Sequence, residues 1–137
     1  MISVDNFILE NKPLSNYDLI DAIKQLKIKH FRGVFLRDQL PSKPRKNECG
    51  IINLADSDDS RGTHWVCYYR KNNKNYYFDS YGLRYPLELE SYLGNTIEYN
   101  KLHIQKNGAI YGHLCLYVLC KLSKGLEIDN IIHNLIP

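Results

Sequence analysis

The sequence predicts an α+β domain built on a central antiparallel or mixed sheet. Its pattern begins with an amphipathic helical segment, continues through several β-branched and aromatic segments, and ends with two more helical segments. Hydrophobic residues make up 44% and charged residues 24% of the chain, as in ordinary globular domains. Because a domain usually takes roughly 100–200 residues, we expect residues 1–137 to form a single domain.

The first helix is predicted after Leu14, in YDLIDAIKQLKI. Ser15 or Asn16 can cap this helix, and its apolar face carries Leu19, Ile23 and Leu26. The next segment, HFRGVFLRDQLP, is predicted to be short and extended up to Pro41. Two prolines and several charges then predict a loop over residues 41–48.

Three strands are predicted in CGIINLA, THWVCYYRK and NYYFDSYG. The hydrated segment DSDDSRG separates the first two, and residues 71–75 connect the second to the third. A short helix, PLELESYL, has Pro86 at its favoured first position, and a further strand is predicted in TIEYNKLHIQ. The apolar segment YGHLCLYVLCKLSKG, ending near Gly125, and the amphipathic segment LEIDNIIHNLI are the last two predicted helices.

Several classes of protein are excluded by composition. No apolar run approaches the roughly 18–20 residues that cross a membrane, and the start, MISVDNFILENK, has no signal-peptide pattern. Phosphate-binding glycine loops are absent, and no zinc-type spacing is formed by Cys49, Cys67, Cys115 and Cys120. We therefore expect no membrane contact, no metal and no cofactor. A cytosolic, nuclear or particle-enclosed location is expected, and secretion is not expected.

Positive charge is concentrated in the first third of the chain. Residues 1–47 carry nine Lys and Arg against five Asp and Glu, whereas residues 48–137 carry nine against ten. The excess centres on RDQLPSKPRKN, with Arg37, Lys43, Arg45 and Lys46. This segment is either a contact for nucleic acid or an acidic partner, with weak binding expected, or simply a solvated loop.

His64 and Asp79 form the first candidate pair for catalysis. His64 lies at the start of one predicted strand and Asp79 at the end of the next, fifteen residues further on. If these strands pair as a hairpin, the two side chains lie at the same end of the sheet. An Asp in that place fixes the imidazole tautomer and stabilises the imidazolium, as a general base requires. The alternatives are a half-buried structural His and a turn-capping Asp.

The segments GTHWVCYY, YYFDSYG and IQKNGAIYGHLCLYVL, in this order and spacing, resemble the adenain-like cysteine endopeptidases. This family comprises adenovirus maturation proteases and relatives in virophages and Polinton-type elements, and is distantly similar to SUMO-specific proteases. The segments FRGVFLRDQLP and GIINL resemble the Polinton-type branch. The resemblance covers residues 14–122 and implies a papain-like, adenain-type fold. It also implies roles for His64 as general base, Asp79 as its orienting group, Gln105 as oxyanion donor, and Trp65 and Gly112 as parts of the cleft.

The position that the resemblance assigns to the nucleophile holds a tyrosine. The family pattern Gln-x5-Cys-Gly-x-x-Cys, counted from Gln105, places the thiol at residue 111, before Gly112 and Cys115. Residue 111 is Tyr, whose phenol has an ordinary pKa near 10 and occupies the space of a scissile carbonyl. Tyr111 reflects natural loss of the nucleophile, an introduced change, or a shifted alignment. Cys115 is a poor substitute, because it lies about 6 Å further along the helix axis.

Three functional hypotheses follow from these observations. The first is a viral or mobile-element homologue of the maturation endopeptidases that has lost its nucleophile and binds a capsid or precursor protein. The second is an active cysteine endopeptidase that uses Cys115 or an unexpected site and cleaves capsid or precursor proteins. The third is a DNA-associated virion protein acting through its basic first third, since adenovirus relatives use DNA as a cofactor.

Overall fold

The computed structural model describes residues 14–55, 64–94, 96–104 and 111–135; of Tyr111, it describes the backbone. In these ranges the chain forms helix α2 (Asn16–Leu26), strands β1 (Phe31–Leu36), β2 (Asn47–Asn53), β3 (Trp65–Lys71) and β4 (Lys74–Phe78), helix α3 (Leu87–Leu93), strand β5 (Ile97–Tyr99), and helices α4 (Tyr111–Ser123) and α5 (Ile128–Leu135). The order of helix, strands and helices matches the predicted α+β pattern.

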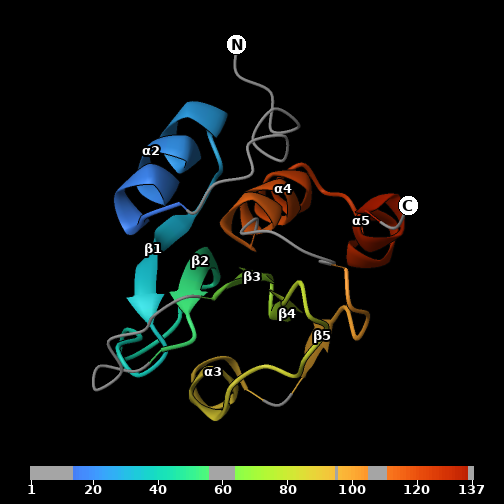
Figure 1. Ribbon diagram of the computed structural model, residues 1–137. Helices are drawn as coiled ribbons and strands as arrows, with labels where there is room; N and C mark the ends of the chain where they lie inside the picture. Colours follow the sequence, from blue (N-terminus) through green and yellow to red (C-terminus); the bar gives the residue numbers. More distant parts are fainter. Residues whose placement is uncertain (1–13, 56–63, 95, 105–110, 136–137) are drawn as a thin grey trace.

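The five strands form one mixed sheet in the order β1-β2-β3-β4-β5. The central strand β3 is antiparallel to both β2 and β4, whereas the outer strands pair in parallel, β1 with β2 and β5 with β4. Helices α2, α4 and α5 lie on one side of this sheet and α3 lies on the other (Figure 1). The sheet is therefore flanked by helices on both faces.

Two apolar cores follow from this layering. On β3, Cys67 and Tyr69 belong to the larger core beneath α2, α4 and α5, while Val66 and Tyr68 belong to the smaller core beneath α3. Successive residues of a strand point to opposite faces, so one short strand supplies both cores. Its burial on both sides explains the nearly continuous apolar run in WVCYY.

A tight turn joins β3 to β4. Asn72 and Asn73 have φ values of 50° and 69°, the left-handed pair that a two-residue hairpin turn favours and that Asn tolerates well. Lys71 already pairs with Lys74, so the connection is shorter than the predicted range of 71–75. The Asn72 N–H also donates to Asn47 Oδ1 at 3.0 Å, which ties the turn to the start of β2.

Strand β5 and helix α3 are shorter than the sequence predicts. The expected strand in TIEYNKLHIQ ends at Tyr99, because the Asn100 side chain bonds to neighbouring backbone and Lys101 has a φ of 58°. Pro86 precedes helix α3 as its N-cap residue, rather than occupying the first helical position. Among the described residues, no helix combines the length and the apolar character required to cross a membrane.

Candidate functional site

The imidazole of His64 contacts the carboxylate of Asp79. Nε2 of His64 lies 2.6 Å from Oδ1 of Asp79, and the two side chains are 13% and 1% exposed. His64 directly precedes β3, and Asp79 directly follows β4, so the hairpin brings both residues to the same end of the sheet. With Nε2 donating to the carboxylate, Nδ1 becomes the basic nitrogen of a neutral imidazole. The predicted pairing of these two residues is therefore present.

Asp79 is held in place by a buried asparagine that the sequence reasoning missed. Asn100 Oδ1 accepts from the Asp79 N–H at 3.2 Å, and its Nδ2 donates to the carbonyls of Asp79 and Leu102 at 2.6 and 2.9 Å. Asn100 is 9% exposed and directly follows β5. Bonds to both the N–H and the carbonyl of Asp79 restrain the backbone from which the carboxylate extends. Asn100 thus acts as a positioning residue for Asp79.

Tyr81 restrains the other side of the pair. Its ring stacks on His64 with centroids 4.5 Å apart and planes 7° from parallel, and His103 meets the Tyr81 ring edge-on with centroids 5.3 Å apart. The Tyr81 N–H donates to Asp79 Oδ1 at 2.9 Å. The predicted strand NYYFDSYG includes Tyr81, but β4 ends at Phe78, and Tyr81 lies in the turn that follows and is 39% exposed. The turn-forming sequence Asp-Ser-Tyr-Gly is the signal from which this position of Tyr81 could have been predicted.

Helix α4 begins beside this pair. A Cβ atom at Gly112 would lie 3.4 Å from Trp65 Cδ1 and 3.2 Å from Leu19 Cδ2, so the first turn approaches the start of β3 closely. Trp65 directly follows His64, and its Nε1 donates to the Leu14 carbonyl at 3.1 Å. The first residue of α4 is Tyr111, and Gln105 lies outside the described residues. The helix N-terminus and the His64–Asp79 pair therefore meet at one end of the sheet.

The four cysteines are all buried. Cys115 is 0% exposed in the larger core, and its carbonyl lies 3.9 Å from Cys67 Sγ. Burial raises the pKa of the Cys49 and Cys67 thiols well above the ordinary value, which disfavours the nucleophilic thiolate. These thiols act as small core groups. Among the described residues, no cluster of His, Cys, Asp and Glu could hold a metal ion.

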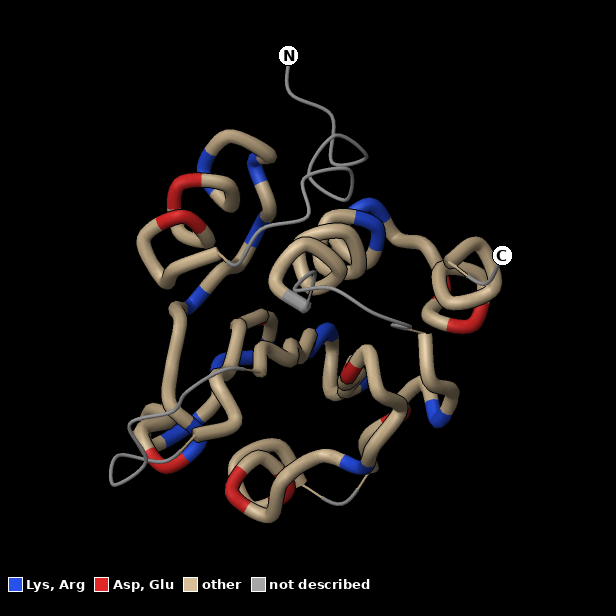
Figure 2. The backbone as a smooth tube through the Cα atoms, viewed as in Figure 1, with Lys and Arg blue, Asp and Glu red and all other residues tan. Residues whose placement is uncertain are grey.

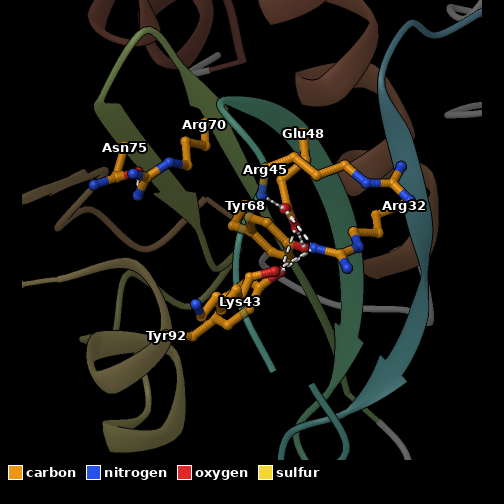
Figure 3. Close-up of polar contacts among 8 residues, drawn as sticks. All are labelled: Arg32, Lys43, Arg45, Glu48, Tyr68, Arg70, Asn75 and Tyr92. Atoms are coloured by element: carbon orange, nitrogen blue, oxygen red, sulfur yellow. Dashed lines mark hydrogen bonds and ion pairs between the residues drawn. The ribbon is translucent and has the colours of Figure 1, made fainter. Parts of the chain in front are cut away.

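A second polar centre surrounds Glu48, which is 0% exposed on β2 (Figure 3). One carboxylate oxygen accepts from Arg32 Nη1 at 3.0 Å and from the Arg45 N–H. The other accepts from the hydroxyls of Tyr68 and Tyr92 at 2.6 and 2.8 Å. Burial by itself raises the pKa of Glu48, but these four hydrogen bonds outweigh burial and hold that pKa below its ordinary value. The carboxylate is therefore charged and fully engaged.

This centre ties the basic loop between β1 and β2 to the sheet. Arg32 Nη1 donates to the Lys43 carbonyl, which also lies 3.3 Å from the Tyr92 hydroxyl, while Glu48 holds the Arg45 N–H. Burial, followed by the hydrogen bond and charge of Glu48, raises the pKa of Tyr92 to about 12, so its hydroxyl stays protonated and able to donate. The backbone of the loop is thus anchored at two points.

The four cations proposed as nucleic-acid contacts fall into two groups. Lys43, Arg45 and Lys46 are exposed, whereas Arg37 lies nearer α3, with Nε 3.6 Å from Glu88 Oε2. Figure 2 shows Lys and Arg in several other segments as well, including the end of α4 where the chain leads to α5. The Glu48 centre is separate from the His64–Asp79 pair. At a rise of about 3.3 Å per residue along β2, it lies roughly 15 Å from the end of that strand near His64.

Comparison with solved structures identifies the fold. The crystal structure of the ASFV pS273R protease superposes with a TM-score of 0.61 at 14% identity, covering 91% of this chain and 62% of that one. The structure of its selenomethionine form gives 0.56 at 15% identity, covering 91% and 63%. Neither a protein-family model nor a curated protein matches the sequence.

The fold is that of a viral protease of the papain-like, α+β class. The five-stranded mixed sheet with flanking helices confirms the predicted fold class. The chain spans about three-fifths of the length of the ASFV pS273R protease. At this level of identity the similarity establishes the architecture, and function must be argued from the residues themselves.

Proposed function

We propose that this protein is a viral or mobile-element homologue of the adenain-like cysteine proteases that binds protein segments without cleaving them. The observation that carries the proposal is the His64–Asp79 contact of 2.6 Å beside the N-terminus of α4, whose first residue is tyrosine. A base and its orienting carboxylate are present. The residue at the expected nucleophile position cannot supply a thiolate.

A thiol at this position would be well placed for activation. A helix N-terminus and a neighbouring imidazolium both stabilise negative charge, which lowers a thiol pKa and raises the thiolate fraction near neutral pH. A phenol with its ordinary pKa near 10 stays protonated under those conditions. The retained role is then to hold an extended segment of a capsid or precursor protein beside this pair and Trp65.

An active enzyme that uses Cys115 is the less favoured hypothesis. Cys115 is completely buried among core residues, next to Cys67. Attack on a peptide carbonyl requires close approach between sulfur and substrate, within roughly 3–3.5 Å. A substrate could reach that sulfur only after the core had opened.

Restoring the thiol tests the proposal directly. The native cysteines are all buried, so an alkylating reagent applied to the folded protein reports selectively on a new thiol. We expect Tyr111→Cys to be alkylated rapidly, with the rate reaching its plateau at a pH below the ordinary thiol pKa of about 8.5. We also expect that variant to cleave denatured polypeptides, while the unmodified chain remains inert.

Two matched variants distinguish activation of the new thiol by the His64–Asp79 pair from simple exposure of that thiol. In the Tyr111→Cys background, His64→Gln removes the base, and Asp79→Asn keeps the side-chain size while removing the charge. Both should return the alkylation profile to that of an ordinary thiol. Equal profiles in all three variants would show that His64 does not act on residue 111. Peptidase activity in the unmodified chain, abolished by Cys115→Ala, would support the active-enzyme hypothesis instead.

A further inference from the structure

The end of the sheet opposite His64 contains a cavity of about 240 Å³ between the β3–β4 turn and the connection from α4 to α5. We call it the hairpin pocket. His64 precedes β3 and the pocket lies beyond its last residues, so the two are separated by roughly 20 Å along the strand. This pocket does not belong to the candidate protease site, and its role is independent of the function proposed above.

The floor and one wall of the hairpin pocket are apolar. Tyr69 and Tyr76 lie directly opposite each other on β3 and β4, and Leu122 closes the floor from α4. Leu126 stands at the wall and is 42% exposed. Its N–H donates to the Lys121 carbonyl at 3.2 Å, just beyond the end of α4, where Gly125 has a φ of 88°. That glycine-terminated cap fixes the exposed leucine in position.

The rim carries a pair of like charges. Lys71 and Lys74 are directly opposite each other in the register and both are exposed. They lie two residues from Tyr69 and Tyr76 along their strands, so they share the pocket face. Like charges placed directly opposite each other destabilise a hairpin. An anionic partner relieves that repulsion, and exposed Lys124 adds positive charge beside the α4 end of the pocket.

We propose that the hairpin pocket binds an acidic peptide segment of a partner protein, with one aliphatic side chain inserted between Leu126 and the tyrosine pair. The volume lies below the roughly 300–1,000 Å³ of sites for drug-sized ligands, and suits one side chain with its flanking backbone. Carboxylates on either side of that anchor face Lys71 and Lys74. The apolar contact supplies affinity, and the charges supply steering.

The lining favours a peptide over nucleic acid. Its cations are lysines, whereas arginine, with its planar fork, is the residue best matched to phosphate. Glu127 also lines the pocket, where its carboxylate repels phosphate and carboxylate groups alike but can accept hydrogen bonds from peptide N–H groups, which a phosphate backbone lacks. The aliphatic side chain of Leu126 offers a contact for an aliphatic side chain of a peptide.

The test uses the full chain and a fluorescein-labelled peptide, Gly-Asp-Glu-Leu-Glu-Asp-Gly, measured by fluorescence anisotropy. Two matched peptides replace the acids by their amides or the leucine by serine. We expect saturable binding of the first peptide that weakens with salt, and at least roughly fivefold weaker binding of both matched peptides. A labelled single-stranded oligonucleotide is the competing probe.

Variants then identify which residues of the protein bind the peptide. Lys71→Gln with Lys74→Gln should weaken binding roughly fivefold to tenfold, since each exposed ion pair contributes modestly. Leu126→Ser should weaken it about tenfold through loss of apolar burial. Lys43→Gln with Arg45→Gln removes the same charge from the basic loop and should leave the affinity unchanged. Circular dichroism of each variant checks that the fold is retained.

Amide chemical shifts decide between this pocket and the His64 site. Shifts on titration should concentrate at Tyr76 and Leu126. The proposal is overturned if the acidic peptide does not bind, if its amide analogue binds equally well, if the oligonucleotide binds more tightly at the same residues, or if the shifts concentrate around His64 and Tyr81. The last result would assign the peptide to the candidate protease cleft and would leave the function proposed for that cleft standing.

Discussion

The imidazole of His64 lies nearly parallel to the phenol ring of Tyr81, with centroids 4.5 Å apart and planes inclined by 7°. The Asp79 oxygen that contacts His64 Nε2 also accepts the Tyr81 N–H. Asp79 therefore orients the imidazole within its plane, while Tyr81 restrains it from above. Both restraints come from a single turn after β4.

Removal of the stacked ring should loosen His64. In the Tyr111→Cys background, we expect Tyr81→Ala to lower the rate of thiol alkylation, because an imidazole free to rotate contacts the thiol for less of the time. Tyr81→Phe keeps the ring and should keep the rate. Urea unfolding should show a loss of about 0.5–1.5 kcal/mol for Tyr81→Ala, the usual contribution of an aromatic pair. Identical alkylation rates for the Ala and Phe variants would contradict this role for the ring.

Asn100 should matter for both stability and the site. Asn100→Ala leaves the Asp79 N–H and the Leu102 carbonyl without their side-chain partner, at a cost of about 1–3 kcal/mol in the free energy of unfolding. We also expect slower alkylation of Cys at position 111, measured where each variant is fully folded. Asn130→Ala, at an exposed position on α5, is the matched control and should change neither quantity.

Glu48 should dominate the acid sensitivity of the fold. Its carboxyl has a pKa below the ordinary value of 4.5, so the folded state binds the proton less readily than the unfolded state. The resulting stabilisation is fully present above pH 4.5 and is lost as the pH falls through the lower, folded-state pKa. Urea unfolding of the native protein should therefore show stability declining below about pH 4.5.

Glu48→Gln tests that assignment. An amide cannot accept all four hydrogen bonds and leaves the Arg32 charge without its counterion, so we expect about 3 kcal/mol lower stability at neutral pH. The difference between variant and native protein should shrink as the pH falls below 4.5, the ordinary pKa of this carboxyl. A constant difference across that range would assign the acid transition to other carboxyl groups. Glu98→Gln, at an exposed position on β5, serves as the control.

The basic loop provides a separate test of the DNA hypothesis. Neutralising Lys43, Arg45 and Lys46 together should reduce weak binding to duplex DNA and lower its dependence on salt, because fewer counterions are released. Arg37→Gln should have little effect, since Arg37 faces Glu88. Electrophoretic mobility shifts over a series of salt concentrations measure both quantities. Binding that is absent, or insensitive to salt, would exclude this function.

The parts of the fold that the sequence predicts well are those with local signals. The Asn-Asn turn between two aromatic strands is enough to pair His64 with Asp79, because a two-residue hairpin permits one register. The capped helix α2 is equally local, with Ser15 and Asp18 bonding to each other's backbone. In both cases the determining residues lie within a few positions of the structure they specify.

The parts missed by sequence reasoning depend on distant partners. The loop predicted over residues 41–48 includes Glu48, since nothing nearby reveals that Tyr68 and Tyr92 surround it. Asn100 was read as part of a strand, although it holds a turn twenty-one residues earlier in the chain. Such roles come from strand order and from the crossover between β1 and β2, neither of which follows from local periodicity.

The short hairpin between His64 and Asp79 also has a consequence for how the protein folds. Closing a loop costs more entropy as the loop lengthens, and this contact spans only fifteen residues. The contact order of the pair is therefore low, and the imidazole can meet its carboxylate as soon as β3 and β4 zip together. The position of residue 111, by contrast, depends on docking α4 across the sheet. A substitution there can abolish chemistry while leaving the acid–base pair to assemble unaided.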